Sequence, residues 1–244
     1  MQTAKQVGVI GLGAMGQGMA GSLRRAGFEV HVCDARPGVA EAFATDGGVA
    51  CASPAELAKS CQVIVSVVVN AAQTEEVLFG PQGAATGMAQ GSVFVMCSTV
   101  DPNWSVALET RLEAMGLLYV DAPISGGAAK AASGQMTMMT AAKPAAYALA
   151  EPLLNAMAAK VYKLGDSAGA GSKVKIINQL LAGVHIAAAA EAMALGLREG
   201  VDPAALYEVI THSAVTAGCS RTAWPMCWRA TTRRCRRWIF LSKT

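Results

Sequence analysis

The sequence predicts an α/β fold, in which a doubly wound, mostly parallel sheet is followed by a long helix and the remnant of an all-α domain. The first observation is that short β-branched runs alternate with helical patterns through the first two-thirds of the chain. Such alternation indicates crossover connections between parallel strands, with helices on both faces of the sheet. The second observation is that strand patterns stop beyond Ala168, where one apolar helical pattern continues to Glu199.

The individual elements follow from the same patterns. Buried strands are expected at Val7–Ile10, Val30–Cys33, Val63–Val69, Val93–Cys97 and Leu117–Val120. The helices between them are expected at Met15–Ala26, Gly38–Thr45, Pro54–Lys59 and Trp104–Met115. Gly200 ends the long helix, and Asp202 caps a further helix that begins at Pro203. We therefore expect a domain boundary near Asp166.

The composition is that of a globular protein, with 53% apolar and 15% charged residues. The seven cysteines form no C-x-x-C pair, so neither a metal site nor a disulfide framework is expected, and reduced thiols suit a cytoplasmic location. The N-terminus has no signal-peptide pattern. The apolar run 176–197 is interrupted by Asn178, Gln179, His185 and Glu191, which favours a buried helix over a membrane span.

A glycine-rich turn follows the first expected strand. Gly11-Leu-Gly-Ala-Met-Gly16 fits the pattern G-x-G-x-x-G, in which Gly11 permits the tight turn, Gly13 lets a pyrophosphate approach and Gly16 lets the helix pack on the sheet. Alone this pattern is weak, because such turns also serve packing. Here a strand precedes it, a helix follows, and Asp34 ends the next strand where a ribose-binding carboxylate belongs. The sequence thus predicts a Rossmann-like dinucleotide site with Gly11, Leu12, Gly13, Ala14, Met15, Gly16 and Asp34.

The charge of Asp34 favours NAD over NADP. A carboxylate accepts hydrogen bonds from a ribose 2′-hydroxyl and repels a 2′-phosphate. Arg36 is the alternative receptor for that phosphate, although a solvated surface charge is the simpler interpretation.

Four motifs in order give the chain a family resemblance. They are Gly11-Leu-Gly-Ala-Met-Gly16, Ser98-Thr99, Asp121-Ala-Pro-Ile-Ser-Gly-Gly127 and Gly171-Ser-Lys-Val-Lys-Ile-Ile-Asn178. Over residues 6–217 the sequence resembles the β-hydroxyacid dehydrogenases, which include 3-hydroxyisobutyrate dehydrogenase and tartronate semialdehyde reductase. Three further stretches resemble the branch of this family that oxidises L-threonate: Val69-Asn-Ala-Ala-Gln73, Lys130-Ala-Ala-Ser-Gly-Gln-Met-Thr137 and Gln179-Leu-Leu-Ala-Gly-Val-His-Ile-Ala-Ala188.

The resemblance assigns roles to further residues. Val69, Asn70 and Thr99 would border the cofactor, although an N-cap hydroxyl before Pro102 is an alternative role for Thr99. The substrate, a small hydroxy acid, would have its carboxylate bound by Ser125, Gly126 and Gly127, for which the alternative is an ordinary glycine turn. Asn178 and Gln179 would contact substrate hydroxyls; many relatives have Asn where this chain has Gln179.

The resemblance implies that Lys175, rather than Lys173, is the general acid/base. Oxidation of an alcohol needs a base for the hydroxyl proton, and a lysine serves near neutral pH only if burial and neighbouring charge lower its pKa. Lys173 lies about 200° away around the helix, by the geometry of 3.6 residues per turn, and is expected to face solvent.

The segment after Gly218 has a different composition. It contains six Arg, one Lys and no acidic residue, together with three of the four Trp and three of the seven Cys. Codons can be chosen for Thr222 to Thr244 so that translation in a shifted reading frame, which begins at the third base of the first codon, gives a different amino-acid sequence. That second sequence is nearly the one that relatives carry at this point. We therefore interpret residues 218–244 as an out-of-frame tail, and 167–217 as a truncated helical substrate and dimerisation domain after a dinucleotide-binding domain, 1–166.

This interpretation has consequences for partners. No nucleic acid and no membrane are expected as partners, although a basic binding tail is the rival interpretation of the tail. Family members are expected to be homo-oligomers, but most of the interface would be missing here. Leu180, Leu181, Val184, Ile186, Met193 and Leu197 would then expose apolar surface, and the chain could be an inactive protein that still binds a dinucleotide.

Overall fold

The computed structural model describes residues 6–213. Residues 1–5 and the predicted out-of-frame tail, 218–244, lie outside the described residues, so that interpretation of the tail stays a prediction. The chain divides into two compact units between Ile176 and Ile177, inside the long helix α8 (Ala170–Arg198). The predicted boundary near Asp166 lies ten residues before this division and also stays a prediction.

The first unit contains one large sheet with strand order β3-β2-β1-β4-β5-β6-β8-β7, in which β9 also pairs with β8. The six strands from β3 to β6 are parallel, whereas β8 runs antiparallel to β6 and β7. The strands are β1 (Gln6–Ile10), β2 (Glu29–Cys33), β3 (Val49–Ala50), β4 (Val63–Ser66), β5 (Val93–Met96), β6 (Leu118–Asp121), β7 (Ile124–Ser125), β8 (Met136–Ala142) and β9 (Ala158–Lys163). The predicted doubly wound, mostly parallel sheet is confirmed.

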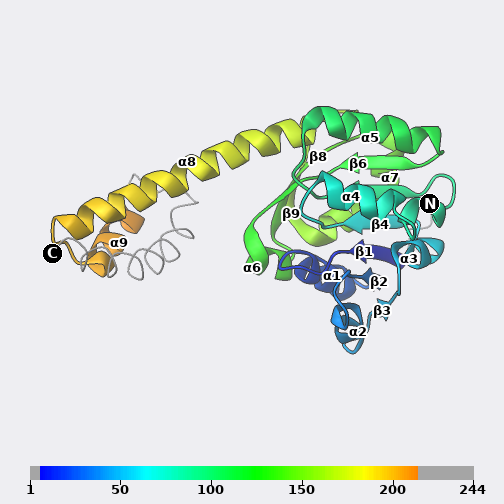
Figure 1. Cartoon of the computed structure of the whole chain (residues 1–244), viewed down its shortest axis with the longest axis horizontal. Coiled ribbons are helices and arrows are strands. Elements are labelled where there is room, and N and C mark those ends of the chain that lie inside the picture. Colours follow the sequence, from blue (N-terminus) through cyan, green and yellow to red (C-terminus); the bar gives the residue numbers. More distant parts are fainter. Residues whose placement is uncertain (1–5, 214–244) are drawn as a thin grey trace. The chain divides into compact units, whose positions relative to one another are not determined.

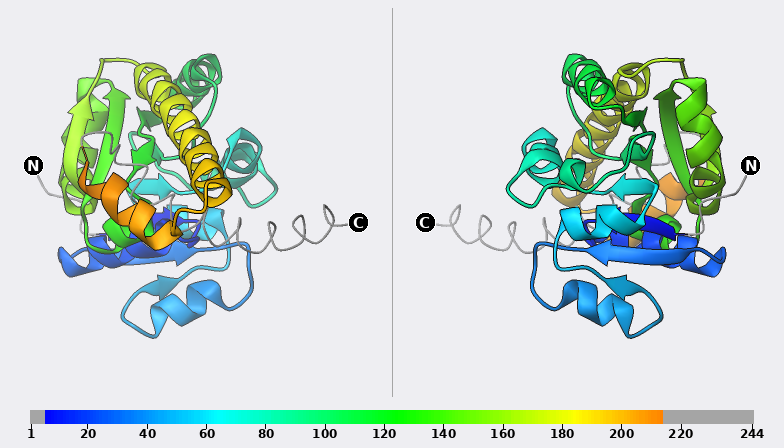
Figure 2. Two further views of the ribbon diagram at one scale, coloured as in Figure 1. Left: turned by 90° about the vertical axis from the view of Figure 1, so that its left-hand side faces the viewer. Right: turned by 90° about the vertical axis from the view of Figure 1, so that its right-hand side faces the viewer.

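Helices cover both faces of this sheet (Figure 1). They are α1 (Gly16–Arg25), α2 (Val39–Ala44), α3 (Pro54–Ser60), α4 (Ala71–Phe79), the short 3-10 helix η1 (Ala84–Thr86), α5 (Pro102–Ala114), α6 (Gly127–Ala132) and α7 (Pro144–Met157). Successive strand residues point to opposite faces, so each strand contributes to two cores. Val63 and Val65 of β4 pack with α1 and α7, while Ile64 packs with α3 and α5. Figure 2 shows β3 and α2 at one edge of the sheet.

The second unit contains the rest of α8 and helix α9 (Pro203–His212). Asp202 caps α9 as predicted, because its Oδ2 accepts a hydrogen bond from the Ala205 amide at 2.9 Å. α9 folds back so that Met193 packs against Leu206, Tyr207 and Ile210. The expectation that Met193 is exposed is therefore wrong: α9 covers this side chain, which is 1% exposed.

The remaining predictions of apolar exposure on α8 have mixed outcomes. Leu180, Leu181, Val184 and Ile186 are exposed as expected, with Leu180 at 67%, whereas Leu197 is half-buried. By length and composition α8 is apolar enough to cross a membrane, and only 17% of its most apolar window is buried. The interpretation of this segment as a buried helix is thus wrong for most of its length within the described residues. A single helix of this kind is weak evidence for a membrane span.

Candidate functional site

The glycine-rich turn connects β1 to α1, and each glycine has a steric reason. Gly11 has φ +92°, and a Cβ there would lie 2.7 Å from the Val67 carbonyl oxygen. A Cβ on Gly16 would collide with the Gly11 carbonyl oxygen. A Cβ on Gly13 would meet nothing within 4 Å. The open space at Gly13 is what close approach of a phosphate to the backbone requires.

Asp34 follows β2 and contacts the same turn. Its Oδ2 accepts a hydrogen bond from the Leu12 amide at 2.6 Å, and its Oδ1 pairs with Arg36 Nε at 2.9 Å. The hydrogen bond from the Arg36 side chain is the largest cause that lowers the pKa of Asp34 to about 2, so this carboxyl group is ionised at neutral pH. Arg36 also donates to the Leu12 carbonyl oxygen at 3.1 Å. Arg36 is largely exposed, but it is ion-paired rather than simply solvated.

A cavity of about 770 Å³ lies at the carboxyl ends of β1 and β4. These strands are adjacent although β2 and β3 separate them in sequence, so the strand order reverses here. Dinucleotides bind at such a reversal in open α/β sheets. Of the residues predicted to bind the cofactor, Gly11, Gly13, Asp34 and Val69 line the cavity. Leu12, Ala14, Met15 and Gly16 belong to the adjoining turn.

Most of the other residues that line this cavity were not predicted from the sequence, and several of them are polar or reactive. Cys33, Gln73 and Glu76 line the cavity beside Asp34 and Val69. The Gln73 side chain accepts a hydrogen bond from the Val69 amide at 2.8 Å, which fixes the loop after β4. Their sequence positions could have indicated them, since Gln73 and Glu76 lie in the helix that begins two residues after Val69. However, α4 itself was not expected.

Asn70 and Thr99 lie at the ends of neighbouring strands. The Asn70 side chain caps α4 by accepting a hydrogen bond from the Gln73 amide at 2.9 Å. Thr99 is exposed, and its alternative role as an N-cap is wrong, because Asp101 caps α5 instead. The preceding Ser98 is buried and donates to the Val68 carbonyl oxygen at 2.7 Å, which joins the two strand ends.

Lys175 is buried although it is a lysine on a mostly exposed helix. Its side chain is 7% exposed, and Nζ donates a hydrogen bond to the Ile124 carbonyl oxygen at 2.7 Å. Burial lowers its pKa because desolvation disfavours the charged ammonium. Lys173, two residues earlier, is exposed as expected. Lys175 is therefore the lysine that has the environment of a general base.

The predicted substrate turn, Ser125–Gly127, directly follows Ile124, whose carbonyl oxygen accepts the hydrogen bond from Lys175. Ile124 and Ser125 form β7, and Gly126 and Gly127 follow with φ of +147° and +79°. Both angles favour glycine, and a Cβ on Gly126 would lie 3.0 Å from the Lys130 Cβ. Ser125 is half-buried and the two glycines are exposed. The structure thus brings Lys175 to the residue before Ser125, two segments that lie fifty residues apart in sequence.

Asp121 is a further residue to which the sequence analysis gave no role, although it begins the Asp121–Gly127 motif. It is fully buried at the end of β6. Its Oδ2 accepts hydrogen bonds from the Gly169 and Ser172 amides at 2.9 and 3.0 Å, and its Oδ1 accepts one from Ser172 Oγ at 2.7 Å. Burial raises the pKa of Asp121, and these hydrogen bonds oppose that rise. Asp121 therefore fixes the first turn of α8, one turn before Lys175.

Asn178 and Gln179 follow Lys175 by three and four residues along α8. Asn178 is half-buried and Gln179 is exposed. At this spacing both belong to the same side of the helix as Lys175. Their predicted contact with substrate stays a prediction.

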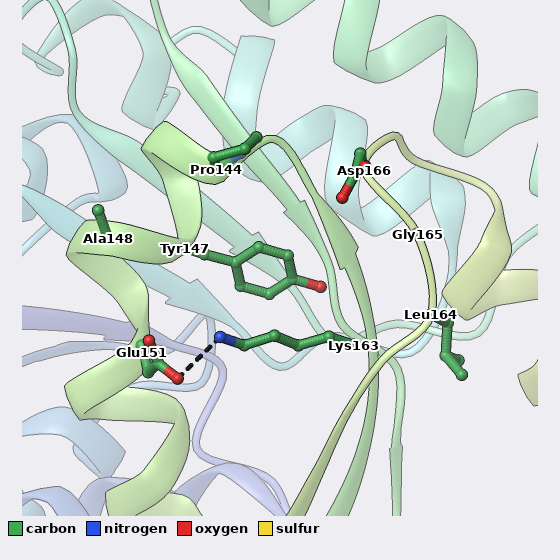
Figure 3. A pocket seen from close by; sticks show the side chains of 8 residues that line it. All are labelled: Pro144, Tyr147, Ala148, Glu151, Lys163, Leu164, Gly165 and Asp166. Atoms are coloured by element: carbon green, nitrogen blue, oxygen red, sulfur yellow. Dashed lines mark hydrogen bonds and ion pairs between the residues drawn. The ribbon is translucent and has the colours of Figure 1, made fainter.

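A second hollow of about 640 Å³ lies between α7 and the end of β9 (Figure 3). None of the predicted site residues lines it. Figure 3 shows that Lys163 pairs with Glu151, at 2.8 Å, beside the ring of Tyr147. The Tyr147 hydroxyl already bonds Thr140 at 2.9 Å. Because these polar groups satisfy one another, we do not assign a ligand to this hollow.

Comparison with known proteins shows the family to which both parts of the chain are similar. Residues 6–165 match the family profile of the NAD binding domain of 6-phosphogluconate dehydrogenase, and residues 169–235 match the profile of the NAD-binding domain of NADP-dependent 3-hydroxyisobutyrate dehydrogenase. An L-threonate dehydrogenase from Cupriavidus necator is 65% identical over 211 residues, which cover 86% of this chain and 71% of the relative. One from Haemophilus influenzae is 43% identical over 85% of this chain and 69% of the relative.

Solved structures agree as well. A crystal structure of 3-hydroxyisobutyrate dehydrogenase from Salmonella typhimurium is 44% identical, with a TM-score of 0.85, and the match covers 89% of this chain and 76% of that one. The two profiles, the 65% identity and this structural match together extend over both units of the molecule. The chain belongs to the 3-hydroxyisobutyrate dehydrogenase-like family of NAD(P)-dependent dehydrogenases, which act on CH–OH groups.

Proposed function

We propose that this chain oxidises the secondary alcohol of a small hydroxy acid, L-threonate, with NAD, and that Lys175 is the general acid/base. The substrate rests on the relatives named L-threonate dehydrogenase, the first of which is 65% identical. Residues 1–166 would form the dinucleotide-binding domain, and 167–217 the truncated helical substrate and dimerisation domain. Four described cysteines are free and buried, which suits the reducing cytoplasm that we propose as its location.

The single observation that carries the proposal is the buried amine of Lys175 against the Ser125 turn. Its Nζ lies 2.7 Å from the Ile124 carbonyl oxygen, immediately before the residues proposed to bind the substrate carboxylate. A general base must lie within hydrogen-bond reach of the proton that it removes. A hydroxy acid whose carboxylate is held at Ser125 would have its hydroxyl close to this amine, because only a short carbon chain separates the two groups of the substrate.

Different groups of the chain would bind the substrate, transfer the proton and bind the cofactor. The Ser125 hydroxyl and the exposed amides of Gly126 and Gly127 would hold the carboxylate and orient the substrate. Lys175, in its neutral form, would remove the proton from the hydroxyl and return it in the reverse reaction. When bound, the nicotinamide supplies the acceptor for the hydride. Asp34 would accept hydrogen bonds from the adenosine ribose hydroxyls.

The electrostatics of Asp34 support NAD over NADP. Its pKa of about 2 keeps a negative charge beside the cavity at any pH near neutral. The Arg36 guanidinium is already paired with that charge, so it offers less to a 2′-phosphate. The family profile matched by residues 169–235 is described as NADP-dependent, so both cofactors belong in the test.

The test is an initial-rate assay of the full 244-residue chain with L-threonate and either NAD or NADP. We expect turnover with NAD, and a loss of about 10²- to 10⁴-fold in kcat for Lys175→Ala, the range that general acid–base catalysis contributes. Lys173→Ala is the matched control, because Lys173 lies on the same turn of α8 but is exposed. Equal activity of wild type and Lys175→Ala would overturn the assignment.

Two alternatives have observations in their favour. The Salmonella structure named 3-hydroxyisobutyrate dehydrogenase makes that substrate part of the assay panel. The family resemblance adds tartronate semialdehyde, which is assayed in the direction of reduction. The exposed apolar side chains of α8, such as Leu180, favour an inactive chain that still binds the dinucleotide. Calorimetric binding of NAD without turnover of any hydroxy acid in the panel would select this alternative.

A further inference from the structure

The helix that follows the dinucleotide turn, α1, packs directly against the helix that follows the substrate turn, α6 (Figure 1). The closest approach is at Gly18. A Cβ on Gly18 would lie 2.6 Å from the Ala132 amide nitrogen and 2.8 Å from the Ala131 carbonyl carbon. Real Cβ atoms do not approach backbone so closely, so only glycine permits this spacing of the two helices.

Two side chains of α1 bind the end of α6. Ser22 is buried, and its Oγ donates a hydrogen bond to the Ala131 carbonyl oxygen at 2.9 Å. Arg25 donates to Ser22 Oγ at 2.7 Å and also to the Ala132 carbonyl oxygen. The last carbonyls of a helix have no partners within it, so such bonds help to satisfy them. The Ala131 carbonyl oxygen also accepts a long hydrogen bond from the Gly134 amide, at 3.4 Å.

α6 depends on these contacts for its position. It has six residues, and a helix of that length is not stable alone in water. It begins at Gly127, directly after Ser125 and Gly126. Ser125 is the last residue of β7, which pairs with β8 through Ser125 and Thr137. α1 begins at Gly16, at the end of the dinucleotide turn. The same helix therefore borders the cofactor turn at its first residue and supports the substrate turn through α6.

We infer that Gly18 and Ser22 are positioning residues that set the substrate turn, Ser125–Gly127, relative to the dinucleotide site. The inference rests on the proposed function, because it takes this turn as the substrate's carboxylate site. A side chain at position 18 would push α6 away from α1 and move Gly126 and Gly127 with it. A displacement of about 1 Å in a group that orients a substrate can cost about a hundredfold in rate.

The experiment compares Gly18→Ala with Gly21→Ala in the full chain. Both glycines lie inside α1, and both changes raise helix propensity equally. A Cβ on Gly21 would meet only the Arg25 guanidinium, at 3.4 Å. For Gly18→Ala we expect KM for the hydroxy acid to rise tenfold or more, while the dissociation constant of NAD changes less than twofold. For Gly21→Ala we expect neither constant to change.

Ser22→Ala provides a second variant, with Ser133→Ala as its control. Ser133 also bonds carbonyls of α6, those of Ala129 and Lys130, but it lies at the end of α6 itself and is exposed. Ser22→Ala should raise KM severalfold, and Ser133→Ala should leave it unchanged. NAD binding reports in each case that the dinucleotide domain is folded.

Hydrogen exchange of the peptide covering residues 124–135 is measured on the same four variants, because it needs no turnover. We expect at least tenfold faster exchange in Gly18→Ala and Ser22→Ala than in their controls. The inference would be overturned if Gly18→Ala changed neither the exchange rate nor KM. It would also be overturned if the dissociation constant of NAD rose by the same factor as KM for the hydroxy acid. If wild type turns over no hydroxy acid, the proposed function fails, and exchange in residues 124–135 still decides whether α1 positions the turn.

Discussion

Lys175 illustrates how burial changes the chemistry of a side chain. Burial lowers its pKa below the usual 10.5, because desolvation disfavours the charged ammonium. A lower pKa enlarges the neutral fraction of the amine at every pH, and the neutral amine is the base. For alcohol oxidation we therefore expect kcat/KM to rise with pH and level off, with a midpoint below 10.5. A pH–rate profile measures this midpoint.

Lys175→Arg is the control for that profile. An arginine keeps the positive charge but stays protonated across the whole range. We expect this variant to lose the rising limb together with most of its activity. An unchanged limb in Lys175→Arg would assign the titration to another group.

Asp34 determines the preferred cofactor at the same scale. Its ionised carboxylate would repel a 2′-phosphate, and its Oδ2 also holds the Leu12 amide. Asp34→Asn removes the charge but keeps an oxygen that can accept the Leu12 hydrogen bond. We expect the ratio of kcat/KM for NADP to that for NAD to rise about tenfold, equivalent to about 1.4 kcal/mol. Steady-state kinetics with each cofactor measure the ratio; a fall would contradict the role of Asp34.

Some of these residues were accessible from the sequence and others were not. Gly11, Gly16 and Asp34 were accessible because each lies at the spacing that the G-x-G-x-x-G pattern and the end of the next strand give to these roles. Asp121 did not follow, because an acid at the end of a strand has no local signal that it will cap a helix fifty residues later. The contact between Gly18 and α6 is likewise long-range in sequence, so no periodicity indicates it.

At the scale of elements, the first turn of α8 depends on Asp121. Its carboxylate accepts two backbone amides and one hydroxyl in a buried site. Asp121→Ala would remove a helix cap and leave these donors unpaired in the interior. Each buried donor left unpaired costs about 1–3 kcal/mol, and three donors lose their acceptor, so we expect the unfolding free energy to fall by about 3 kcal/mol or more. Urea denaturation measures this loss.

Asp101→Ala is the matched control for that substitution. Asp101 also caps a helix, α5, by accepting the Asn103 and Trp104 amides, but it is exposed. Water can replace its hydrogen bonds, so we expect a loss of about 1 kcal/mol. An equal fall in the free energy of unfolding in the two variants would show that the burial of Asp121 does not increase the stabilisation that its cap provides.

The elements themselves were predicted best where the pattern was strongest. The strand Val93–Cys97 is observed as β5 at Val93–Met96, and the helix Pro54–Lys59 as α3 at Pro54–Ser60. The strands β8 and β9 and the helices α4 and α7 were not expected. β8 consists of Met and Ala, which favour helices, and of Thr, which favours strands, so its composition is ambiguous and its conformation is set by pairing with β6, β7 and β9.

At the scale of the whole molecule, the two units differ in how much apolar surface they bury. The sheet of the first unit has its apolar side chains in two cores, one on each face. The second unit has a small cluster around Met193. Sequence patterning predicted a change from mixed strands and helices to helices alone near residue 168 but could not tell which side of α8 the helix α9 would cover. Burial on a mostly apolar helix is decided by its neighbours rather than by its own period.

The exposed apolar side chains of α8 predict self-association of the chain. Contiguous exposed apolar surface promotes association between proteins. Leu180 and Leu181 are more than half exposed, so replacing both with Gln should reduce concentration-dependent association while changing the unfolding midpoint little. Met193→Gln is the contrasting control: Met193 packs against α9, so its replacement should destabilise the second unit and increase association. Sedimentation velocity at several concentrations, with thermal unfolding, measures both effects, and equal behaviour of the two variants would show that the exposed side chains of α8 do not drive association.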